Sequence, residues 1–337
     1  MNILITGATG NIGLAVLKRL YQQDHQITVL ARDSKKNAKT LKDFPNVNVI
    51  HGDITSQTDV DEACKNQDYA IHLAAIIPPL VDKKPELAKQ VNLEGTRKLI
   101  QGLEKHSPNC FLIFSSSVTV YGDRLKTPLI SVNDPIQTTQ WDKYGQAKIE
   151  SEKLIQKSNL DWTIFRLSAI MGIGNHKVSK IIFHVPLDTI MEIATVDDTS
   201  RAFANSIGKK DRLNKRIFNL GGGDSCIITY QEFLNRAFKS FGMGNALFPD
   251  KTFAEANFHC GKFSDSDELE SILKFRKDTI ESYFDQFRAS VPGLQRFVTI
   301  PFGSIIKFFL GRISEPRKAI KHNNKEEIIR FFGTQNI

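Results

Sequence analysis

The chain has few cysteines, and they do not form the patterns that cross-link a small domain or bind a metal. Its four cysteines, Cys64, Cys110, Cys226 and Cys260, lie far apart, and no Cys-x-x-Cys spacing occurs. Isolated cysteines of this kind fit a reducing compartment and argue against a disulfide framework or a zinc site. His259 precedes Cys260, but no second pair of ligands follows at a metal-binding spacing, so we predict no metal site.

Long apolar runs are also absent. No stretch approaches the ~20 apolar residues that span a bilayer. The first apolar strand begins at residue 2, which leaves no room for a signal peptide, so we expect a cytoplasmic protein. The net charge is +8, yet no basic motif interleaved with aromatic residues occurs. We therefore expect no nucleic-acid partner and assign the charge to an enzyme that binds a phosphorylated cofactor.

A glycine-rich turn follows the first strand. Apolar residues Ile3 to Ile5 predict a strand, and Gly7, Gly10 and Gly13 then lead into an amphipathic stretch. Glycines let a backbone approach a pyrophosphate, and a helix N-terminus offers unpaired N–H donors with a partial positive charge. We predict that this turn binds the phosphates of a dinucleotide.

Strands and helices alternate over the first half of the chain. Further strands are expected at 26–31, 47–50, 69–75, 110–114 and 162–166, with helices at 58–65, 86–106 and 141–158. Such alternation predicts an α/β fold with a Rossmann-type parallel sheet, doubly wound with helices on both faces.

The rhythm loosens beyond Gly172, and phenylalanines concentrate in the last third. Strands are expected at 193–196 and 217–220, and helices at 199–207, 230–241, 265–274 and 278–289. We predict a dinucleotide-binding domain over residues 1–172, to which parts of 193–222 return. Residues 173–337 would form mainly a smaller C-terminal substrate lobe and a tail.

The tail is strongly apolar from Phe297 to Leu310, and a basic run follows it. Pro301 and Gly303 are expected to interrupt any long helix there. One interpretation is an element that touches a membrane surface or a partner, with a basic flank. The other is an apolar segment that closes the substrate lobe, and we favour it because terminal elements are often held by docking.

Three serines and a Tyr/Lys pair indicate the chemistry. Ser115 to Ser117 follow the fifth strand, and ligands bind at the carboxyl edge of open parallel sheets. Downstream, Tyr144 and Lys148 lie four residues apart and therefore on one helical face. An ammonium near a phenol would lower its pKa from ~10 toward neutrality. A phenol of that acidity can act as general acid/base in an alcohol–ketone interconversion.

Together these motifs resemble an extended short-chain dehydrogenase/reductase of the NAD(P)-dependent epimerase/dehydratase family. The similarity covers about residues 1–235. The matching segments are Thr6–Gly13, Gly52–Ile54, His72–Ala75, Val91–Thr96, Ser115–Ser117, Tyr144–Lys148, Arg166–Gly172, Val196–Asp198 and Phe218–Gly222.

The resemblance implies roles for the matched positions. Tyr144 would donate or accept the proton, Ser117 would hold the substrate oxygen with Ser116 as a nearby alternative, and Lys148 would bind the nicotinamide ribose. Asn92 would either cap a helix start or contact the cofactor. A homodimer through the helix that bears Tyr144 is also implied. The residues expected at the cofactor are Gly7, Ala8, Thr9, Gly10, Asn11, Ile12, Gly13, Arg32, Lys36, Asp53, Ile54, Leu73, Ala74, Ala75, Asn92, Ser115, Tyr144, Lys148 and Leu167.

Charge at the end of the second strand distinguishes the two nicotinamide cofactors. An acidic residue there would accept both ribose hydroxyls and repel a 2′-phosphate. This chain has Ala31 at that place, followed by Arg32, Lys35 and Lys36. A guanidinium can bind a phosphate through two hydrogen bonds, so NADP(H) is favoured over NAD(H).

The expected function is an NADP(H)-dependent oxidoreductase acting on a carbonyl or secondary alcohol. The run from Arg166 to Gly172 departs from the sugar-nucleotide pattern, and only a short connection, 173–192, precedes the next strand. That connection, and phenylalanines lining the site, would favour a smaller or more apolar substrate. The alternatives are an NAD-dependent sugar-nucleotide epimerase or dehydratase and a non-catalytic NADP(H)-binding sensor or scaffold.

Overall fold

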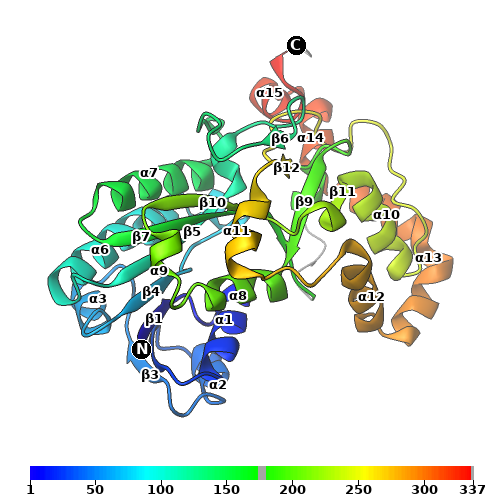
Figure 1. The fold of residues 1–337 in the computed structure, drawn as a ribbon. Coiled ribbons are helices and arrows are strands. Elements are labelled where there is room, and N and C mark those ends of the chain that lie inside the picture. The colour runs from blue at the N-terminus through cyan, green and yellow to red at the C-terminus, as the bar shows by residue number, and fades with distance from the viewer. Residues whose placement is uncertain (174–179, 335–337) are drawn as a thin grey trace.

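A seven-stranded parallel sheet forms the centre of the molecule (Figure 1). We describe it from a computed structural model, in which residues 1–173 and 180–334 are described. The strands lie in the order β10-β7-β5-β4-β1-β2-β3. Their bounds are β1 (Asn2–Thr6), β2 (Gln26–Ala31), β3 (Asn48–His51), β4 (Tyr69–His72), β5 (Phe111–Ser117), β7 (Asp161–Leu167) and β10 (Arg216–Leu220). The predicted doubly wound parallel sheet is confirmed.

Side chains of each central strand alternate between two buried layers, because successive residues of a strand point to opposite faces. In β5, Phe111 and Ile113 join one apolar cluster, whereas Leu112 and Phe114 join the other. The first layer is covered by α1 (Asn11–Tyr21), α2 (Lys35–Leu41), α8 (Val196–Asn205), α9 (Lys210–Leu213) and α11 (Ser266–Leu273). The second is covered by α3 (Gln57–Ala63), α6 (Gly95–His106) and α7 (Lys143–Lys157).

The rest of the chain forms a second lobe with its own aromatic core. Phe233, Phe253 and Phe284 are among the phenylalanines buried in this core. Its elements are β6 (Leu129–Ile130), β8 (Ala169–Met171), β9 (Ile190–Thr195), β11 (Ile227–Thr229), α10 (Tyr230–Ser240), β12 (Lys262–Phe263), α12 (Ile280–Ser290), α13 (Gly293–Arg312), α14 (Glu315–Lys321) and α15 (Lys325–Phe332). Residues 174–179 of the expected 173–192 connection lie outside the described residues. The idea that the late phenylalanines line the site loses its support, because many of them fill this core.

Two elements of the first half differ from expectation in a way that shapes the cleft. β4 ends at His72 rather than 75, because the backbone then leaves the sheet and bonds to side chains: the amide of Ala74 donates to Thr6 and that of Ile76 to Asn92. The helix expected over 86–106 is continuous but not uniform. After α4 (Leu80–Lys83), α5 (Pro85–Lys89) passes through a wider π-helical turn, Gln90–Glu94, into α6.

The expectation that Pro301 and Gly303 interrupt the tail helix is wrong. α13 runs unbroken for 20 residues from Gly293 to Arg312. Pro301 lies on the exposed side, where a carbonyl that lacks its helical partner can bind water. Gly303 lies against the lobe, and a Cβ there would come within 3.1 Å of Met243 Cα. The glycine thus permits close contact rather than ending the helix.

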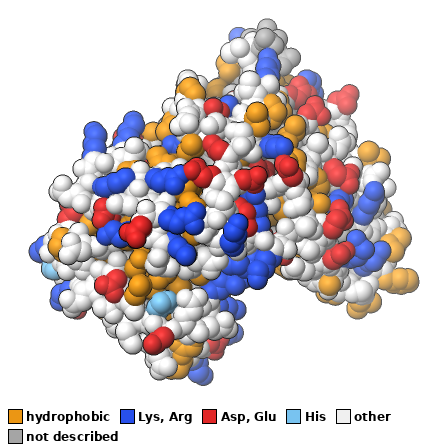
Figure 2. Space-filling view, in the orientation of Figure 1, with side chains coloured by type: hydrophobic (Ala, Val, Ile, Leu, Met, Phe, Trp, Pro, Cys, Tyr) orange, Lys and Arg blue, Asp and Glu red, His pale blue; other side chains and the backbone are white. Residues whose placement is uncertain are grey.

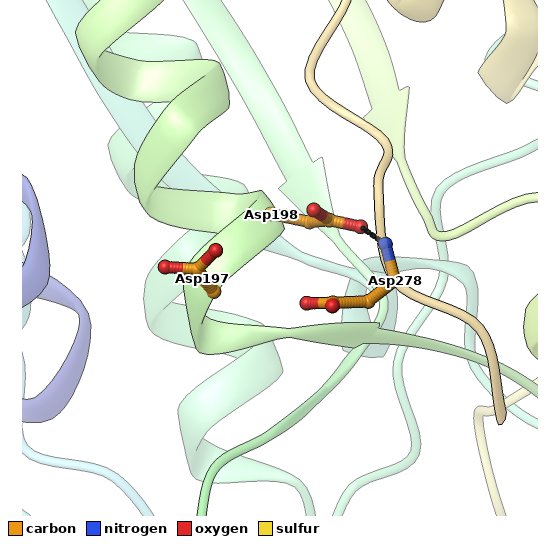
Figure 3. Close-up of side chains that lie close together, drawn as sticks. All are labelled: Asp197, Asp198 and Asp278. Atoms are coloured by element: carbon orange, nitrogen blue, oxygen red, sulfur yellow. Dashed lines mark hydrogen bonds between the residues drawn. The ribbon is translucent and has the colours of Figure 1, made fainter. Parts of the chain in front are cut away.

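A cluster of carboxylates joins the lobe to the sheet domain. Asp197 and Asp198 open α8, and Asp278 lies on the segment that returns from α11 (Figure 3). Asp198 is buried and accepts hydrogen bonds from the amides of Lys277 and Asp278, at 3.0 Å each. Arg201 pairs with both Asp197 and Asp198, so a side chain of the protein already offsets the negative charge of these carboxylates. We interpret it as a structural joint.

Replacing Asp198 by alanine should therefore be far more damaging than replacing its neighbour. Asp198→Ala leaves two backbone amides without their hydrogen-bond acceptor and removes one carboxylate partner of Arg201. We therefore expect the free energy of unfolding to fall by about 2–4 kcal/mol. Asp197→Ala removes only exposed ion pairs and should cost less than about 1 kcal/mol. Urea unfolding of both variants measures the difference. Equal losses would contradict the role assigned to Asp198.

Candidate active site and cofactor cleft

A cleft of about 630 Å³ opens at the carboxyl ends of β1, β2 and β4. Its wall contains the glycine turn, the end of β2 and the loop after β4. The lining residues are Thr6, Gly7, Thr9, Gly10, Leu30, Ala31, Arg32, Asp33, Ser34, Lys36, Asn37, Gly52, Asp53, Ile54, Leu73, Ala74, Ala75, Ile76, Leu80, Leu87 and Val91. The sheet edge predicted to bind ligand is thus hollowed.

The glycine turn fits a bound pyrophosphate. Gly7 has a φ of +74°, and a Cβ there would lie 2.6 Å from the amide nitrogen of Ala74. A Cβ on Gly13 would lie 2.1 Å from the carbonyl oxygen of Gly7. These two glycines allow the turn to close against the next strand and against its own helix. Gly10 lines the cleft just before α1, where backbone N–H groups without helical partners are available to phosphate oxygens.

Five polar side chains line the end of the cleft beyond β2. Arg32 and Lys36 are two of the three cations expected there, whereas the third, Lys35, does not line the cleft. Ser34 and Asn37 also line it, and Asn37 Nδ2 donates to the carbonyl of Arg32 at 2.8 Å, which orders this loop. Asp33 also lines the cleft, and the sequence argument overlooked it. Its position directly after Arg32 was the available signal. An anionic and a cationic side chain therefore stand side by side where the adenosine ribose would bind.

Ten of the expected cofactor residues line this cleft and nine do not. Those on its wall are Gly7, Thr9, Gly10, Arg32, Lys36, Asp53, Ile54, Leu73, Ala74 and Ala75. Those off it are Ala8, Asn11, Ile12, Gly13, Asn92, Ser115, Tyr144, Lys148 and Leu167. Ala8 and Gly13 are buried inside the turn, and Ile12 packs against the core. Their part is to shape the turn.

Asn92 holds the loop that forms one cleft wall. Its side-chain oxygen accepts from the amide of Ile76 at 2.7 Å, and its side-chain nitrogen donates to the carbonyl of Ile76 at 2.8 Å. The residue lies inside the π-helical turn, not at a helix start, so the expectation of a helix cap is wrong. The wider turn is the reason, because it points a buried side chain at the neighbouring loop.

The three serines are the last residues of β5 rather than following it, because the strand continues to Ser117, and they have different partners. Ser115 Oγ donates to the carbonyl of His72 at 3.0 Å, and Ser116 Oγ donates to Glu152 at 2.5 Å. Ser117 is only half-buried, and its Oγ accepts from the amide of Thr119 at 3.3 Å. Since Ser116 is committed to a buried carboxylate, Ser117 is the better placed of the two for a substrate oxygen.

Lys148 joins α7 to the end of β5. Its Nζ donates to the carbonyl of Ser115 at 2.6 Å and lies 5.6 Å from the centre of the Tyr144 ring. The ammonium is buried, and the loss of hydration lowers the pKa of Lys148 to about 7, against the attraction of Glu152.

The expected lowering of the pKa of Tyr144 is wrong. Burial raises the pKa of the phenol well above its usual range, and the nearby Asp142 carboxylate acts in the same direction. The physical reason is that burial disfavours the phenolate, while the same burial weakens the positive charge of Lys148 that was expected to stabilise it.

A buried ion pair behind these residues was missed by the sequence argument. Arg166, fully buried, donates from Nε to one Glu152 oxygen at 3.1 Å and from Nη2 to the other at 2.8 Å. Its Nη1 donates to the hydroxyl of Tyr121 at 2.9 Å. Glu152 follows Lys148 by four residues, as Lys148 follows Tyr144, so this helical spacing was the signal that could have found it.

The comparison with known proteins agrees with this geometry. A model of the NAD dependent epimerase/dehydratase family matches residues 3–221. A D-erythronate dehydrogenase of Haemophilus influenzae is 29% identical over 177 residues, which are 50% of this chain and 55% of the relative. A 3-beta-hydroxysteroid dehydrogenase of Mycolicibacterium neoaurum is 24% identical over 192 residues, 54% of this chain and 50% of the relative. The chain thus spans about half the length of these curated relatives.

A solved structure shows the same fold over most of both chains. The UDP-glucose 4-epimerase of Thermotoga maritima, crystallised with UDP-glucose, superimposes with a TM-score of 0.71 at 19% identity. The match covers 86% of this chain and 98% of the epimerase. At this coverage the likeness extends past residue 221, where the family model ends, and so includes more of the second lobe than that model does.

The lowered pKa of Lys148 predicts a pH-dependent stability. An unfolded lysine loses its proton near pH ~10.4, whereas Lys148 loses it near 7 in the fold. Between these values the unfolded state holds more protons, so stability from this group rises with pH. Relative to Lys148→Met, the parent should gain about 2 kcal/mol between pH 7 and pH 9.

Urea unfolding of both proteins without cofactor, at pH 6, 7.5 and 9, measures this gain. Lys143→Met on the same helix is the matched control, because Lys143 is exposed, and it should show no such trend. A constant difference between the parent and Lys148→Met across this range would contradict the lowered pKa.

Proposed function

Since the chain belongs to the NAD dependent epimerase/dehydratase family, we propose that it is an NADP(H)-dependent oxidoreductase. Its reaction would interconvert a carbonyl group and a secondary alcohol on a small molecule. The observation that carries the proposal is the docking of α7 on β5, where Lys148 bonds to Ser115 two residues before Ser117 and lies beside Tyr144. This docking supports the proposal, because it would bring a proton-transfer group and a hydroxyl for the substrate oxygen to the same edge of the sheet.

The cleft supplies a separate place for each part of the cofactor. The turn around Gly10 would take the pyrophosphate, and Asp53 with Ile54 would lie against the adenine. Arg32 and Lys36 would bind a 2′-phosphate, which is why NADP(H) is proposed over NAD(H). When bound, the nicotinamide supplies or accepts the hydride.

The chain's own residues would handle the proton. Ser117 would hold the substrate oxygen by a hydrogen bond, and Tyr144 would transfer the proton to or from that oxygen. The phenol of Tyr144 is protonated at neutral pH, so it could donate its proton in the reducing direction, and the raised pKa makes its use as a base dependent on a nearby positive charge. Lys148, once its ammonium is bound to ribose hydroxyls, would stabilise the phenolate that remains.

Epimerase or dehydratase activity on a sugar nucleotide is the second candidate. It is favoured by the likeness of the fold to a UDP-glucose 4-epimerase over both lobes. Such an enzyme returns the hydride to its substrate and keeps its NAD. Retention of NAD by the purified protein would support this candidate, and exchange of added NADPH would support the oxidoreductase. The third candidate is a sensor or scaffold that binds NADP(H) without turnover. This candidate would be supported if Tyr144→Phe left the cellular function intact.

Removing the phenol should abolish turnover without weakening cofactor binding. With the best substrate from a panel of aldehydes and ketones, Tyr144→Phe should lower kcat by about 10²- to 10⁴-fold. The dissociation constant of NADPH, measured by fluorescence, should stay within about twofold of the parent value. The hydroxyls give a matched pair: Ser117→Ala should lower kcat, whereas Ser116→Ala should lower thermal stability because it loses the bond to Glu152.

The cofactor preference depends on the cations after β2. Arg32→Ala combined with Lys36→Ala should raise the KM for NADPH by more than about tenfold, because each side chain loses a charged hydrogen bond to phosphate. The KM for NADH should change little. Asp33→Ala is the control in the same loop and should leave the NADPH preference in place or increase it. A parent enzyme that prefers NADH would refute the assignment.

A further inference from the structure

Helix α13 is attached to the lobe mainly by polar and small residues, and near its end Leu310 packs against the aromatic core. Thr299 donates its hydroxyl to the carbonyl of Phe241, and Gly303 lies against Met243. Lys307 Nζ donates to the carbonyls of Met243 and Asn245, at 3.0 and 2.8 Å. Residues 299, 303 and 307 repeat every fourth position, so one narrow stripe of the helix makes these contacts.

The opposite stripe of α13 is apolar and open to solvent. Its members recur at intervals of three or four residues, which places them on one helical face. They are Leu294, Phe297, Val298, Phe302, Ile305, Phe308 and Phe309, and each exposes between 51% and 77% of its surface. Four phenylalanines and one leucine lie on this stripe. A contiguous exposed apolar surface of this kind usually marks a site of interaction with a partner or a membrane. Figure 2 shows orange side chains along the right-hand edge, where α12 and α13 lie in Figure 1.

Basic residues outnumber acidic residues in the segment that contains this surface. Residues 289–321 contain six basic residues, Arg296, Lys307, Arg312, Arg317, Lys318 and Lys321, and one acidic residue, Glu315. Glu315 is already paired with Lys180 and His184. Near the start of α13, Arg296 shares a cavity of about 230 Å³ with Arg236, Lys239 and Arg288. Arg236 is paired with Glu281 of α12, and Arg288 lies 3.8 Å from Asp285. Within the described residues, neither Arg296 nor Lys239 pairs with a carboxylate.

We propose that α13 docks on the surface of an anionic phospholipid bilayer. The helix would lie in the plane of the membrane, with its phenylalanine stripe at the boundary of headgroups and acyl chains. The cations at both ends would contact lipid phosphates. This attachment would hold the catalytic domain beside the membrane and does not depend on which reaction it catalyses.

The packing of α14 favours an in-plane helix over a spanning one. Among the described helices none is by itself long and apolar enough to cross a bilayer, and α13 reaches that threshold only together with α14, across a bend of 60°. Ala319 of α14 is buried against α15, and Ser314 just before it donates to the carbonyl of Thr252 at 2.6 Å. α14 is therefore part of the lobe, which leaves α13 alone at the surface.

Charge favours a lipid surface over a second copy of the chain. A two-fold pairing of α13 helices would be antiparallel or parallel, and both arrangements bring basic ends together without acids to offset them. An anionic bilayer has the opposite charge and accepts apolar side chains of any detailed shape. The exposed stripe and its cations thus suit the same partner.

The test uses the full-length protein and flotation of vesicles in a density gradient. Binding to vesicles of equal phosphatidylglycerol and phosphatidylcholine is expected, with weaker binding to pure phosphatidylcholine and at high salt. Phe302→Ser combined with Phe308→Ser should reduce binding at least tenfold. Because both side chains face solvent, the circular dichroism spectrum and NADPH affinity should not change. The matched control is Leu247→Ser, which removes an exposed leucine outside α13 and should bind like the parent.

A second variant separates charge from apolarity. Arg312→Gln combined with Lys318→Gln should weaken binding to anionic vesicles but not to phosphatidylcholine. Failure of the parent to float with anionic vesicles would overturn the proposal, as would equal flotation of the phenylalanine variant. A parent dimer that the same phenylalanine variant converts to monomer, without vesicle binding, would assign the stripe to a second copy instead. Light scattering distinguishes these masses.

Discussion

The buried ion pair between Arg166 and Glu152 is the constraint on which the arrangement of the site depends. A charge taken out of water must find a partner with good geometry, and here both carboxylate oxygens of Glu152 accept from the guanidinium. Arg166 lies on β7 and Glu152 on α7, one turn after Lys148. The pair therefore fixes the rotation and depth of α7 on the sheet. Separating Glu152 from Arg166 would leave a buried charge without a partner, so the ion pair also holds Tyr144 and Lys148 in position on the same helix.

The same guanidinium also reaches the second lobe through a chain of hydrogen bonds. Arg166 donates to Tyr121, the Tyr121 hydroxyl donates to Asn219, and Asn219 donates to Asp265. Asp265 lies next to α11, which packs on β10. Since Asn219 is on β10, the last strand added to the sheet is connected to the catalytic helix by polar contacts as well as by packing.

Patterns with a short period were readable from the sequence, whereas contacts between distant segments were not. The sheet followed from alternating apolar strands, and the cleft from glycines that must adopt a positive φ or approach another backbone, as Gly7 does. The role of Asn92 could not be predicted from the sequence, because it depends on a π-helical turn for which no residue pattern is diagnostic. The direction in which the pKa of Tyr144 shifts could not be predicted either, because burial of the phenol is its largest cause.

The tail shows why hydropathy alone does not place a segment. An apolar segment avoids water, but its composition does not say which surface shields it. In α13 most contacts with the lobe are made by Thr299, Gly303 and Lys307, and Leu310 alone of its large apolar residues packs against the aromatic core among the described contacts. The phenylalanines of α13 consequently add little to the stability of the isolated protein. A helix that packs by its polar side and presents its apolar side outward is organised for an apolar surface outside the chain.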